Sequence, residues 1–207
     1  MNQKNSLNLD SCFLDLDNPI ELFKSWMSEA EKKETKDPTA LSLATTNSAG
    51  QPDVRMVLLK GLNSEGFLFY TNLNSSKSRD LRENPKAAMC FHWKSFNRQI
   101  RILGNVIQVN DKEADLYFKS RPYESRINAW ASDQSKPMNE RSEFLKKIED
   151  FKKKYKNEKN VPRPPHWSGW CLKPLSIEFW LHKDNRNHER LRYNKTSKGW
   201  KKEILYP

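Results

Sequence analysis

Apolar residues near the N-terminus recur with the period of an α-helix. Over residues 19–34 one helical face carries the apolar side chains, which are Leu22, Phe23, Trp26, Met27 and Ala30. Asn18 precedes Pro19, a pairing typical of an N-cap followed by the first helical residue. The pattern predicts an amphipathic helix over 19–34, ended by Asp37-Pro38.

After residue 39 the helical period gives way to short β-branched and aromatic runs. These runs cover residues 40–46, 54–60, 66–71, 87–93 and 98–109, and turn-forming residues separate them. A short helical segment is expected within SSKSRDLRENP (75–85). Because the first connections are too short for parallel crossovers, the strands are expected to pair antiparallel in a meander that curls into a barrel.

Helical patterns return in the second half of the chain. Helices are expected over 111–120 and from Tyr123, and a stripe in 139–157 (Phe144, Ile148, Phe151, Tyr155) favours core packing. Two or three closing strands are expected around 176–182, 188–193 and 199–206. The predicted fold class is α+β, an antiparallel β-barrel with peripheral helices in one domain over 18–207, preceded by a flexible segment over 1–17.

Composition narrows the class of protein. The chain has 207 residues, of which 36% are hydrophobic and 11% aromatic, enough for one domain with a core. No stretch reaches the ~18 apolar residues of a membrane-spanning helix, and the acidic N-terminus does not fit a signal peptide. We therefore expect a cytoplasmic protein. The scattered Cys12, Cys90 and Cys171 predict neither a disulfide framework nor a structural metal site.

The net charge of +11 raises nucleic acid, anionic membranes and phosphorylated small molecules as partners. Much of this charge lies in lysine-rich runs such as 146–159, which are usually solvated helix faces. The chain lacks the glycine-rich phosphate loops and has only six glycines. Any phosphate must therefore be held by side chains.

Two groups of residues have the chemistry of phosphate sites. Tyr70-Thr71 ends a predicted strand, and Ser75-Ser76-Lys77 begins a predicted helix. Hydroxyls, a lysine and the free backbone N–H groups of the helix N-terminus meet there, as a phosphate site requires. Serine capping of the helix alone explains this pattern equally well. Tyr117 and Arg121 lie four residues apart, and Pro122 can begin a helix whose first turn holds Ser125. That arrangement predicts a clamp of a guanidinium and two hydroxyls.

Three further groups are ambiguous taken singly. Arg55 and Lys60 stand at the two ends of an apolar strand and point to opposite faces of it. Gln99 shares a strand face with Arg101. Each of these two groups fits either a ligand contact or an ordinary surface position. After Glu178-Phe179-Trp180, strand alternation would place Arg186, His188 and Arg190 on one face. Such a face suits an anionic aromatic ligand.

Several motifs occur together in a fixed order between Pro19 and Pro207. They are DPTALSLATT, RMVLLK, FYTN, RQIRILG, YFKSRP, Gln134-Ser135 and EFW followed by R-x-H-x-R, W and LYP. With these motifs the chain resembles the pyridoxamine 5′-phosphate oxidase family. The resemblance implies a split-barrel homodimer with FMN at the subunit interface. It also implies oxidation of pyridoxine and pyridoxamine 5′-phosphates by O2 to pyridoxal 5′-phosphate, with release of H2O2.

The resemblance also implies a role for each matching residue. The FMN contacts would be Arg55, Met56, Val57, Leu58, Leu59, Lys60, Tyr70, Thr71, Ser76, Lys77, Gln99, Gln134, Ser135, Trp180 and Arg190. The substrate phosphate would lie among Lys60, Tyr117, Arg121 and Ser125. Arg186 and His188 would be the catalytic pair over the pyridine ring, and which of them is the base stays open.

The chain departs from the family pattern at four places. Ser76 replaces an arginine, Asn187 replaces a leucine, a Leu-His-Lys-Asp-Asn run replaces a glycine-rich link, and residues 1–17 lack the basic-tyrosine segment that covers the substrate in some members. Two alternatives follow. One is a sister FMN oxidase that acts on a phenazine-type ring, although such a ring has no phosphate for the predicted clamp to bind. The other is a basic, non-catalytic barrel that binds nucleic acid.

Overall fold

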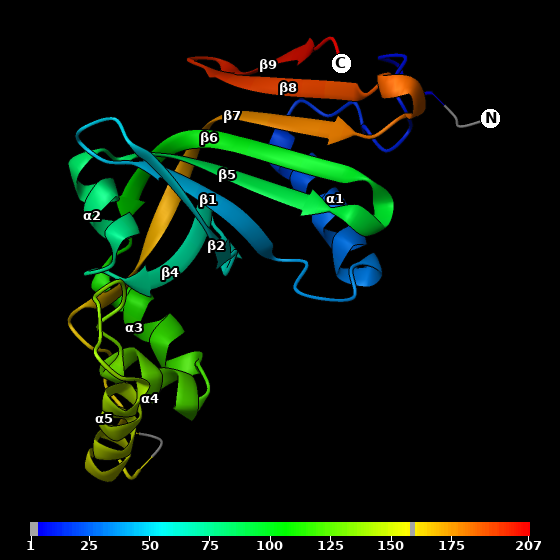
Figure 1. Ribbon diagram of the computed structural model, residues 1–207. Coiled ribbons are helices and arrows are strands. Elements are labelled where there is room, and N and C mark those ends of the chain that lie inside the picture. Colours follow the sequence, from blue (N-terminus) through cyan, green and yellow to red (C-terminus); the bar gives the residue numbers. More distant parts are fainter. Residues whose placement is uncertain (1–3, 158–159) are drawn as a thin grey trace.

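A computed structural model describes residues 4–157 and 160–207 of the chain. The described residues form one antiparallel sheet of nine strands, in the order β2-β1-β5-β6-β7-β4-β3 with β8 and β9 joined through β7 (Figure 1). The strands are β1 (Ala40–Thr46), β2 (Pro52–Leu58), β3 (Gly61–Leu62), β4 (Phe67–Asn72), β5 (Lys86–Trp93), β6 (Arg98–Gln108), β7 (Trp167–Leu181), β8 (Glu189–Thr196) and β9 (Gly199–Ile204). The sheet curls into a half-barrel, which confirms the predicted antiparallel barrel class.

Five helices accompany the sheet in the described ranges, as the hydrophobic patterns predicted. They are α1 (Pro19–Lys33), α2 (Ser76–Glu83), α3 (Asp111–Ser120), α4 (Tyr123–Ala131) and α5 (Arg141–Lys154). The Asn18 side chain accepts a hydrogen bond from the Ile20 N–H and so caps α1 as predicted. None of the described helices is long and apolar enough to cross a membrane.

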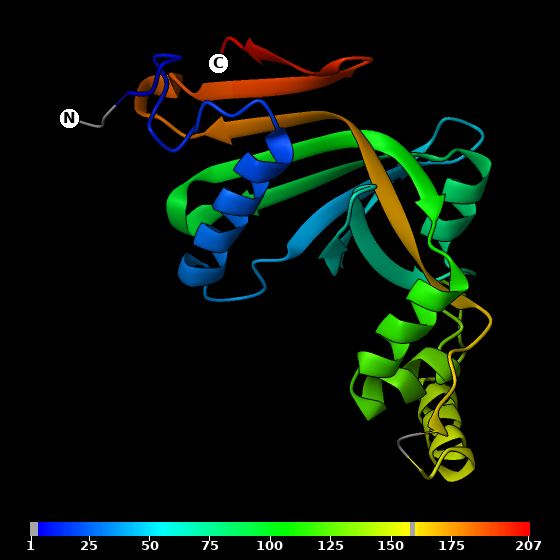
Figure 2. The ribbon, with the colours of Figure 1, turned by 180° about the vertical axis from the view of Figure 1, so that it is seen from behind.

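Helix α1 lies across one face of the sheet and buries its apolar stripe there (Figure 2). The Phe23 ring contacts Phe67 and Phe91 edge-on at 4.9 and 5.5 Å between centroids. Trp26 meets Phe179 in the same way at 5.2 Å. Edge-to-face contacts of this kind add stabilisation to the burial of the rings themselves, so this face is the centre of the core.

The N-terminal strap, residues 4–17, was expected to be flexible because of its polar composition. In the structure its apolar side chains pack against the rest of the protein: Phe13 is fully buried, and its ring centroid lies 5.3 Å from that of Trp26. The Trp26 indole N–H donates to the Cys12 carbonyl, and the Tyr193 hydroxyl of β8 donates to the Leu16 carbonyl. Residues 1–3 of the expected flexible segment lie outside the described residues.

Strand β7 changes partners along its length. Its first part pairs with β4, from Trp167 opposite Asn72 to Leu172 opposite Phe67, and its second part pairs with β8 from Ser176 onward. The prediction that this strand begins near 176 was wrong, because WSGW and Pro174 do not show a strand pattern. One continuous strand therefore joins the two ends of the molecule.

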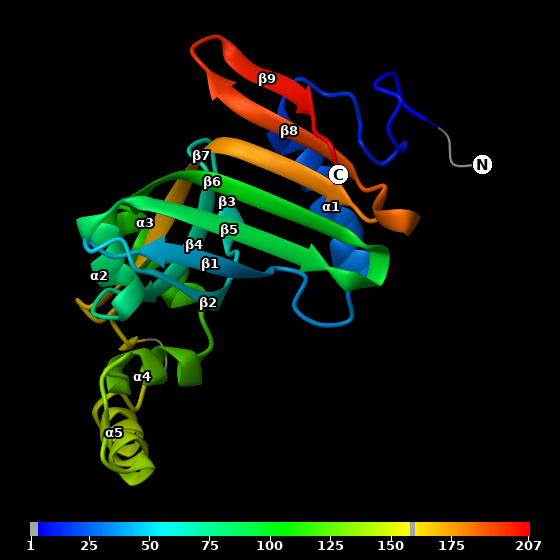
Figure 3. The ribbon, with the colours of Figure 1, turned by 45° about the horizontal axis from the view of Figure 1, so that its top comes forward.

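The change of partners coincides with an irregularity in the pairing of β6 with β7. Their register shifts between Leu103 and Gly104, and a Cβ on Gly104 would lie 2.1 Å from the Lys173 carbonyl oxygen. Only glycine allows this approach, since every other residue carries a Cβ. Beyond it, α3, α4 and α5 form a small helical lobe at one end of the sheet (Figure 3).

Gly104→Ala should therefore lower the free energy of unfolding by about 1–3 kcal/mol, the usual range for overpacking against atoms that cannot move aside. Denaturant unfolding of the variant measures this loss. The control is Asn105→Ala, which changes the exposed neighbouring residue and should alter the free energy of unfolding by less than about 0.5 kcal/mol. Equal stabilities of the two variants would contradict the close approach.

Candidate functional site

A cavity of about 630 Å³ lies between the sheet and the helical lobe. Most of its lining residues had been singled out in the sequence; the lining is Met56, Val57, Leu58, Lys60, Tyr70, Thr71, Lys77, Tyr117, Ser120, Arg121, Pro122, Ser125, Gln134 and Trp167. Leu59, also an expected FMN contact, does not line this cavity: it is 8% exposed and belongs to the main hydrophobic core. The predicted clamp of Tyr117, Arg121 and Ser125 is thus brought together in one place.

Lys77 is a buried cation at the first turn of α2. It is 7% exposed, and its Nζ donates to Thr71 Oγ1, Ser75 Oγ and Gln134 Oε1 at 3.2, 3.1 and 3.0 Å. Burial, with the nearby positive charge of Arg55 as a lesser cause, lowers the pKa of Lys77 to about 8. Because these three partners are all neutral, this ammonium suits an anionic ligand.

Ser76 and Ser135 extend this polar group toward solvent. Their hydroxyl oxygens lie 3.5 Å apart, and Ser135 has a left-handed backbone with φ of 69°. A non-glycine residue in this conformation is uncommon and occurs often at ligand sites. We call Thr71, Ser76, Lys77, Gln134 and Ser135, together with Arg55, the phosphate cluster.

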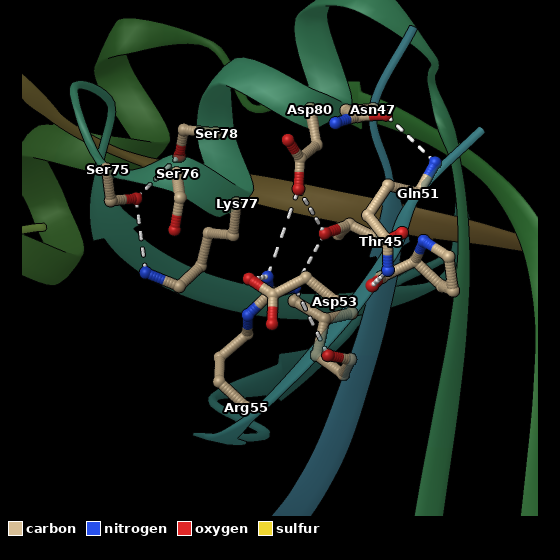
Figure 4. Close-up of polar contacts among 12 residues, drawn as sticks. Thr45, Asn47, Gln51, Asp53, Arg55, Ser75, Ser76, Lys77, Ser78 and Asp80 are labelled. Carbon is tan, nitrogen blue, oxygen red and sulfur yellow. Dashed lines mark hydrogen bonds and ion pairs between the residues drawn. The ribbon is translucent and has the colours of Figure 1, made fainter. Parts of the chain in front are cut away.

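Arg55 is held on three sides beneath α2 (Figure 4). Its Nη1 donates to Thr45 Oγ1 at 2.6 Å, and its Nη2 donates to Asp53 Oδ2 at 2.5 Å and lies 3.9 Å from Asp80 Oδ2. The buried Thr45 hydroxyl donates in turn to Asp80 Oδ2 at 2.6 Å. Sequence reasoning missed these three partners. The signal available was Asp53 two residues before Arg55 on the same strand face.

Three aromatic rings form one wall of the cavity. Tyr70 stacks on Tyr117 at 3.9 Å between centroids and on Trp167 at 5.5 Å. Gly169 makes room for this stack, since a Cβ there would lie 2.6 Å from the Tyr70 ring. Burial raises the pKa of Tyr70 to about 12, so its hydroxyl stays protonated. Sequence reasoning missed Trp167 because it lies in the unpredicted first part of β7.

Arg121 lies over this wall as a half-buried cation. Its guanidinium is 4.7 Å from the Trp167 ring centroid, and its Nη1 is buried with no hydrogen-bond partner among the described residues. Burial lowers the pKa of Arg121 below its ordinary value. A buried, unpartnered N–H on a cation is costly unless a ligand accepts from it. An anion in this cavity would satisfy it.

A second set of predicted residues lies on β6 and β7 and at the start of β8. We call it the C-terminal cluster: Gln99, Trp180, His188 and Arg190. Gln99 is opposite Trp180, which is opposite Arg190. The Trp180 ring is 4.7 Å from His188, and Arg190 donates from Nε and Nη2 to Glu178 Oε1 at 2.9 and 2.8 Å. These residues therefore form one contiguous patch.

The prediction that Arg186, His188 and Arg190 share one strand face was wrong. Strand β8 begins only at Glu189, and Arg186 ends a short 3-10 turn, η3 (Asp184–Arg186). Both Asn185 and Arg186 are left-handed, with φ of 54° and 60°. A tight turn between β7 and β8 needs such residues, whereas an alternating strand would not provide it. Arg186 thus holds a strained conformation at the edge of the patch.

The two clusters are separate within one chain. Among the residues described, no hydrogen bond, ion pair or ring contact joins the phosphate cluster to the C-terminal cluster. Figures 1 and 3 place the η3 turn at the end of β7 that lies away from α2 and α4. The predicted site residues are therefore gathered at two places rather than one.

Comparison with known proteins places the whole chain among relatives of one kind. The family model described as pyridoxamine 5′-phosphate oxidase matches residues 27–155. A second, described as the pyridoxine 5′-phosphate oxidase C-terminal dimerisation region, matches residues 167–207. The chain is 59% identical to the pyridoxine/pyridoxamine 5′-phosphate oxidase of Pelagibacter ubique, with all of both chains covered. It is 51% identical to that of Hyphomonas neptunium over 92% of this chain and 88% of the relative.

A solved structure of PhzG from Burkholderia lata, in complex with tetrahydrophenazine-1-carboxylic acid, is similar with a TM-score of 0.89 and 29% identity. That match covers 95% of this chain and 96% of the other. An FMN-binding protein from Nostoc punctiforme shares the fold, with a TM-score of 0.72, 17% identity and coverage of 91% and 98% of the two chains.

The phosphate cluster predicts pH-dependent anion binding. Only protonated Lys77 attracts an anion, so affinity is highest below its pKa of about 8 and falls above it. Sulfate, whose charge is constant in this range, should bind roughly tenfold more weakly at pH 9 than at pH 7, as titration at constant ionic strength would measure. Lys77→Met should abolish the dependence, whereas the exposed Lys112→Met should keep it. A flat wild-type profile would contradict the assignment.

Proposed function

The chain belongs to the pyridoxamine 5′-phosphate oxidase family, and on that premise we propose that its two clusters, one from each of two copies, hold FMN and the substrate between them. It oxidises pyridoxine and pyridoxamine 5′-phosphates to pyridoxal 5′-phosphate with O2, releasing H2O2. The observation that carries the site proposal is a pair of cations, the buried Lys77 and the half-buried Arg121 with its buried Nη1, which pair with no carboxylate in the described part of the chain.

The phosphate cluster fits the phosphate of FMN. Lys77 and Arg55 supply two positive charges, and Thr71, Ser76 and Ser135 supply hydroxyl donors around them. Hydrogen bonds from charged donors to phosphate are about twice as strong as neutral ones. Ser76 offers a hydroxyl where the family usually has an arginine, so Arg55 and Lys77 carry most of the attraction in this chain. When bound, FMN supplies the acceptor for a hydride from the substrate and passes the electrons on to O2.

The neighbouring clamp fits the substrate phosphate. Arg121 presents the buried Nη1 described above, and Lys60, Tyr117 and Ser125 line the same cavity. The stacked rings of Tyr70 and Tyr117 form the wall on one side of this cavity. Two phosphate sites in one cavity suit a phosphorylated cofactor beside a phosphorylated substrate. A tricyclic substrate without phosphate would leave Arg121 unsatisfied.

The homodimer completes the site. The family model described as a dimerisation region covers 167–207 and so contains Trp180, Arg186, His188 and Arg190. Strand β2 presents Val54 and Met56, each 64% exposed, beside the cavity residues of the same strand. Exposed apolar side chains gathered in this way are typical of surfaces that another chain covers. A second copy seated there would bring its C-terminal cluster to the cavity.

Arg186 and His188 then act on the substrate ring. His188 Nδ1 accepts a hydrogen bond from the Lys183 backbone N–H at 3.2 Å, so neutral His188 carries its proton on Nε2. This leaves Nε2 to face the substrate. Arg186 adds a positive charge beside it, which orients the anionic substrate and eases proton loss from its alcohol or amine.

We expect the purified protein to be a yellow dimer with one FMN per subunit. Flavin released on denaturation gives the stoichiometry, and light scattering gives the mass. Arg190→Ala should release FMN more readily, because the family resemblance places Arg190 at the cofactor, and its mass should stay that of a dimer. A monomer that cannot bind added FMN would disprove both the cofactor and the shared site.

Arg121→Ala should raise KM for pyridoxine 5′-phosphate by roughly ten- to a hundredfold, since a charge-assisted hydrogen bond to phosphate contributes about 1.5–3 kcal/mol. Steady-state kinetics with saturating FMN measures the effect. With unphosphorylated pyridoxine, wild type and variant should be equally poor. The matched control is Lys119→Ala, which removes an exposed positive charge two residues away. An unchanged KM in Arg121→Ala would remove the clamp assignment.

A further inference from the structure

The turn between β7 and β8 carries the catalytic pair but has little support of its own. Residues 184–187 are exposed, and Asn185 and Arg186 are both left-handed. Within the turn, the hydrogen bond from Lys183 N–H to His188 Nδ1 links its two ends. Strained backbone of this kind persists only where the surroundings hold it. The strap of residues 4–17 provides that hold.

Asp10 of the strap bonds to both ends of the turn. Its Oδ2 accepts from Lys183 Nζ at 2.8 Å, and its backbone N–H donates to Glu189 Oε2 at 2.5 Å. Lys183 and Glu189 directly enclose the segment with Arg186 and His188. Figure 3 shows the strap beside β8 and the η3 turn.

The contacts of Asp10 are sheltered from solvent. The Asp10 side chain is 11% exposed, and that of its partner Lys183 is 27% exposed. The second carboxylate oxygen, Oδ1, accepts from the Cys12 N–H at 3.1 Å. The buried side chains of Leu9 and Phe13 fix the strap on either side. An ion pair held this way constrains geometry more than a fully exposed pair does.

We propose that Asp10 is a positioning residue for the oxidation, acting through Lys183 on the turn that carries Arg186 and His188. The inference rests on the proposed function, because it needs those two residues at the substrate. Lys183 connects the strap directly to the imidazole: its side chain donates to Asp10, and its backbone N–H donates to His188 Nδ1. Loss of the Asp10 carboxylate charge frees Lys183 and with it the orientation of the imidazole.

The strap offers a matched control in Asp15. Its Oδ1 pairs with Lys202 of β9 at 2.6 Å, so it ties the same segment to the same sheet but away from the turn. Asp15→Asn and Asp10→Asn each remove one ion pair of the strap and keep the size of the side chain. The Asp10→Asn variant still retains the backbone bond to Glu189. Only the Asp10 change reaches the turn.

The experiment compares the holoenzymes of wild type, Asp10→Asn, Lys183→Met, the double variant, Asp10→Glu and Asp15→Asn. Asp10→Asn and Lys183→Met should each lower kcat/KM for pyridoxine 5′-phosphate by roughly three- to tenfold per folded molecule, with the FMN dissociation constant unchanged. The double variant should be no worse than either single variant, because both break one linkage. Asp10→Glu should restore most of the loss, and Asp15→Asn should keep wild-type kinetics.

Other results would overturn the inference. Equal, small losses of Tm in Asp10→Asn and Asp15→Asn with unchanged kcat/KM would make the strap purely structural. Additive losses in the double variant would show that Asp10 does not act through Lys183. Either result leaves an active wild type, whereas a wild type without FMN or oxidase activity would defeat the proposed function itself.

Discussion

The site depends on one buried cation, Lys77, and one half-buried cation, Arg121, and neither pairs with a carboxylate among the residues described. Moving an ammonium or guanidinium out of water costs several kcal/mol even after the surroundings relax. Lys77 meets this cost with neutral oxygens from Thr71, Ser75 and Gln134, and Arg121 with the face of Trp167. Both arrangements leave the positive charge unneutralised. The cavity therefore carries positive charge that suits an anion, such as the phosphate of the proposed ligands.

Arg55, a cation of the same cluster, does have carboxylate partners. Asp53 and Asp80 both lie beside its guanidinium, and Thr45 links it to Asp80. The Asp80 side chain is 14% exposed, whereas that of Asp53 is 56% exposed. A sheltered carboxylate fixes the guanidinium, and a solvated one can give way to a ligand. Arg55 can thus keep the sheltered Asp80 as a neighbour while a ligand displaces the solvated Asp53.

The path of β7 separates the two clusters within one chain. Its first part carries Trp167 and Gly169 at the cavity, and its last part carries Trp180 at the other end of the sheet. The close approach at Gly104 allows this strand to leave β4 and join β8. One strand with two partners thus holds the two clusters apart, which is why the proposed site draws on a second copy.

Local patterns in the sequence were sufficient for most elements and for the chemistry of single residues. Helix α1 with its Asn18 cap, the antiparallel strands, and the groups around Lys77 and Arg121 follow from periodicity, capping and short connections, which depend on neighbours along the chain. Tertiary structure alone decided the rest. The first part of β7, the left-handed Arg186, the partners of Arg55 and the wall at Trp167 arise from contacts between distant segments. The strap shows this most clearly: its polar composition predicts flexibility, but two buried side chains, Leu9 and Phe13, gain enough from burial to fix it against the sheet.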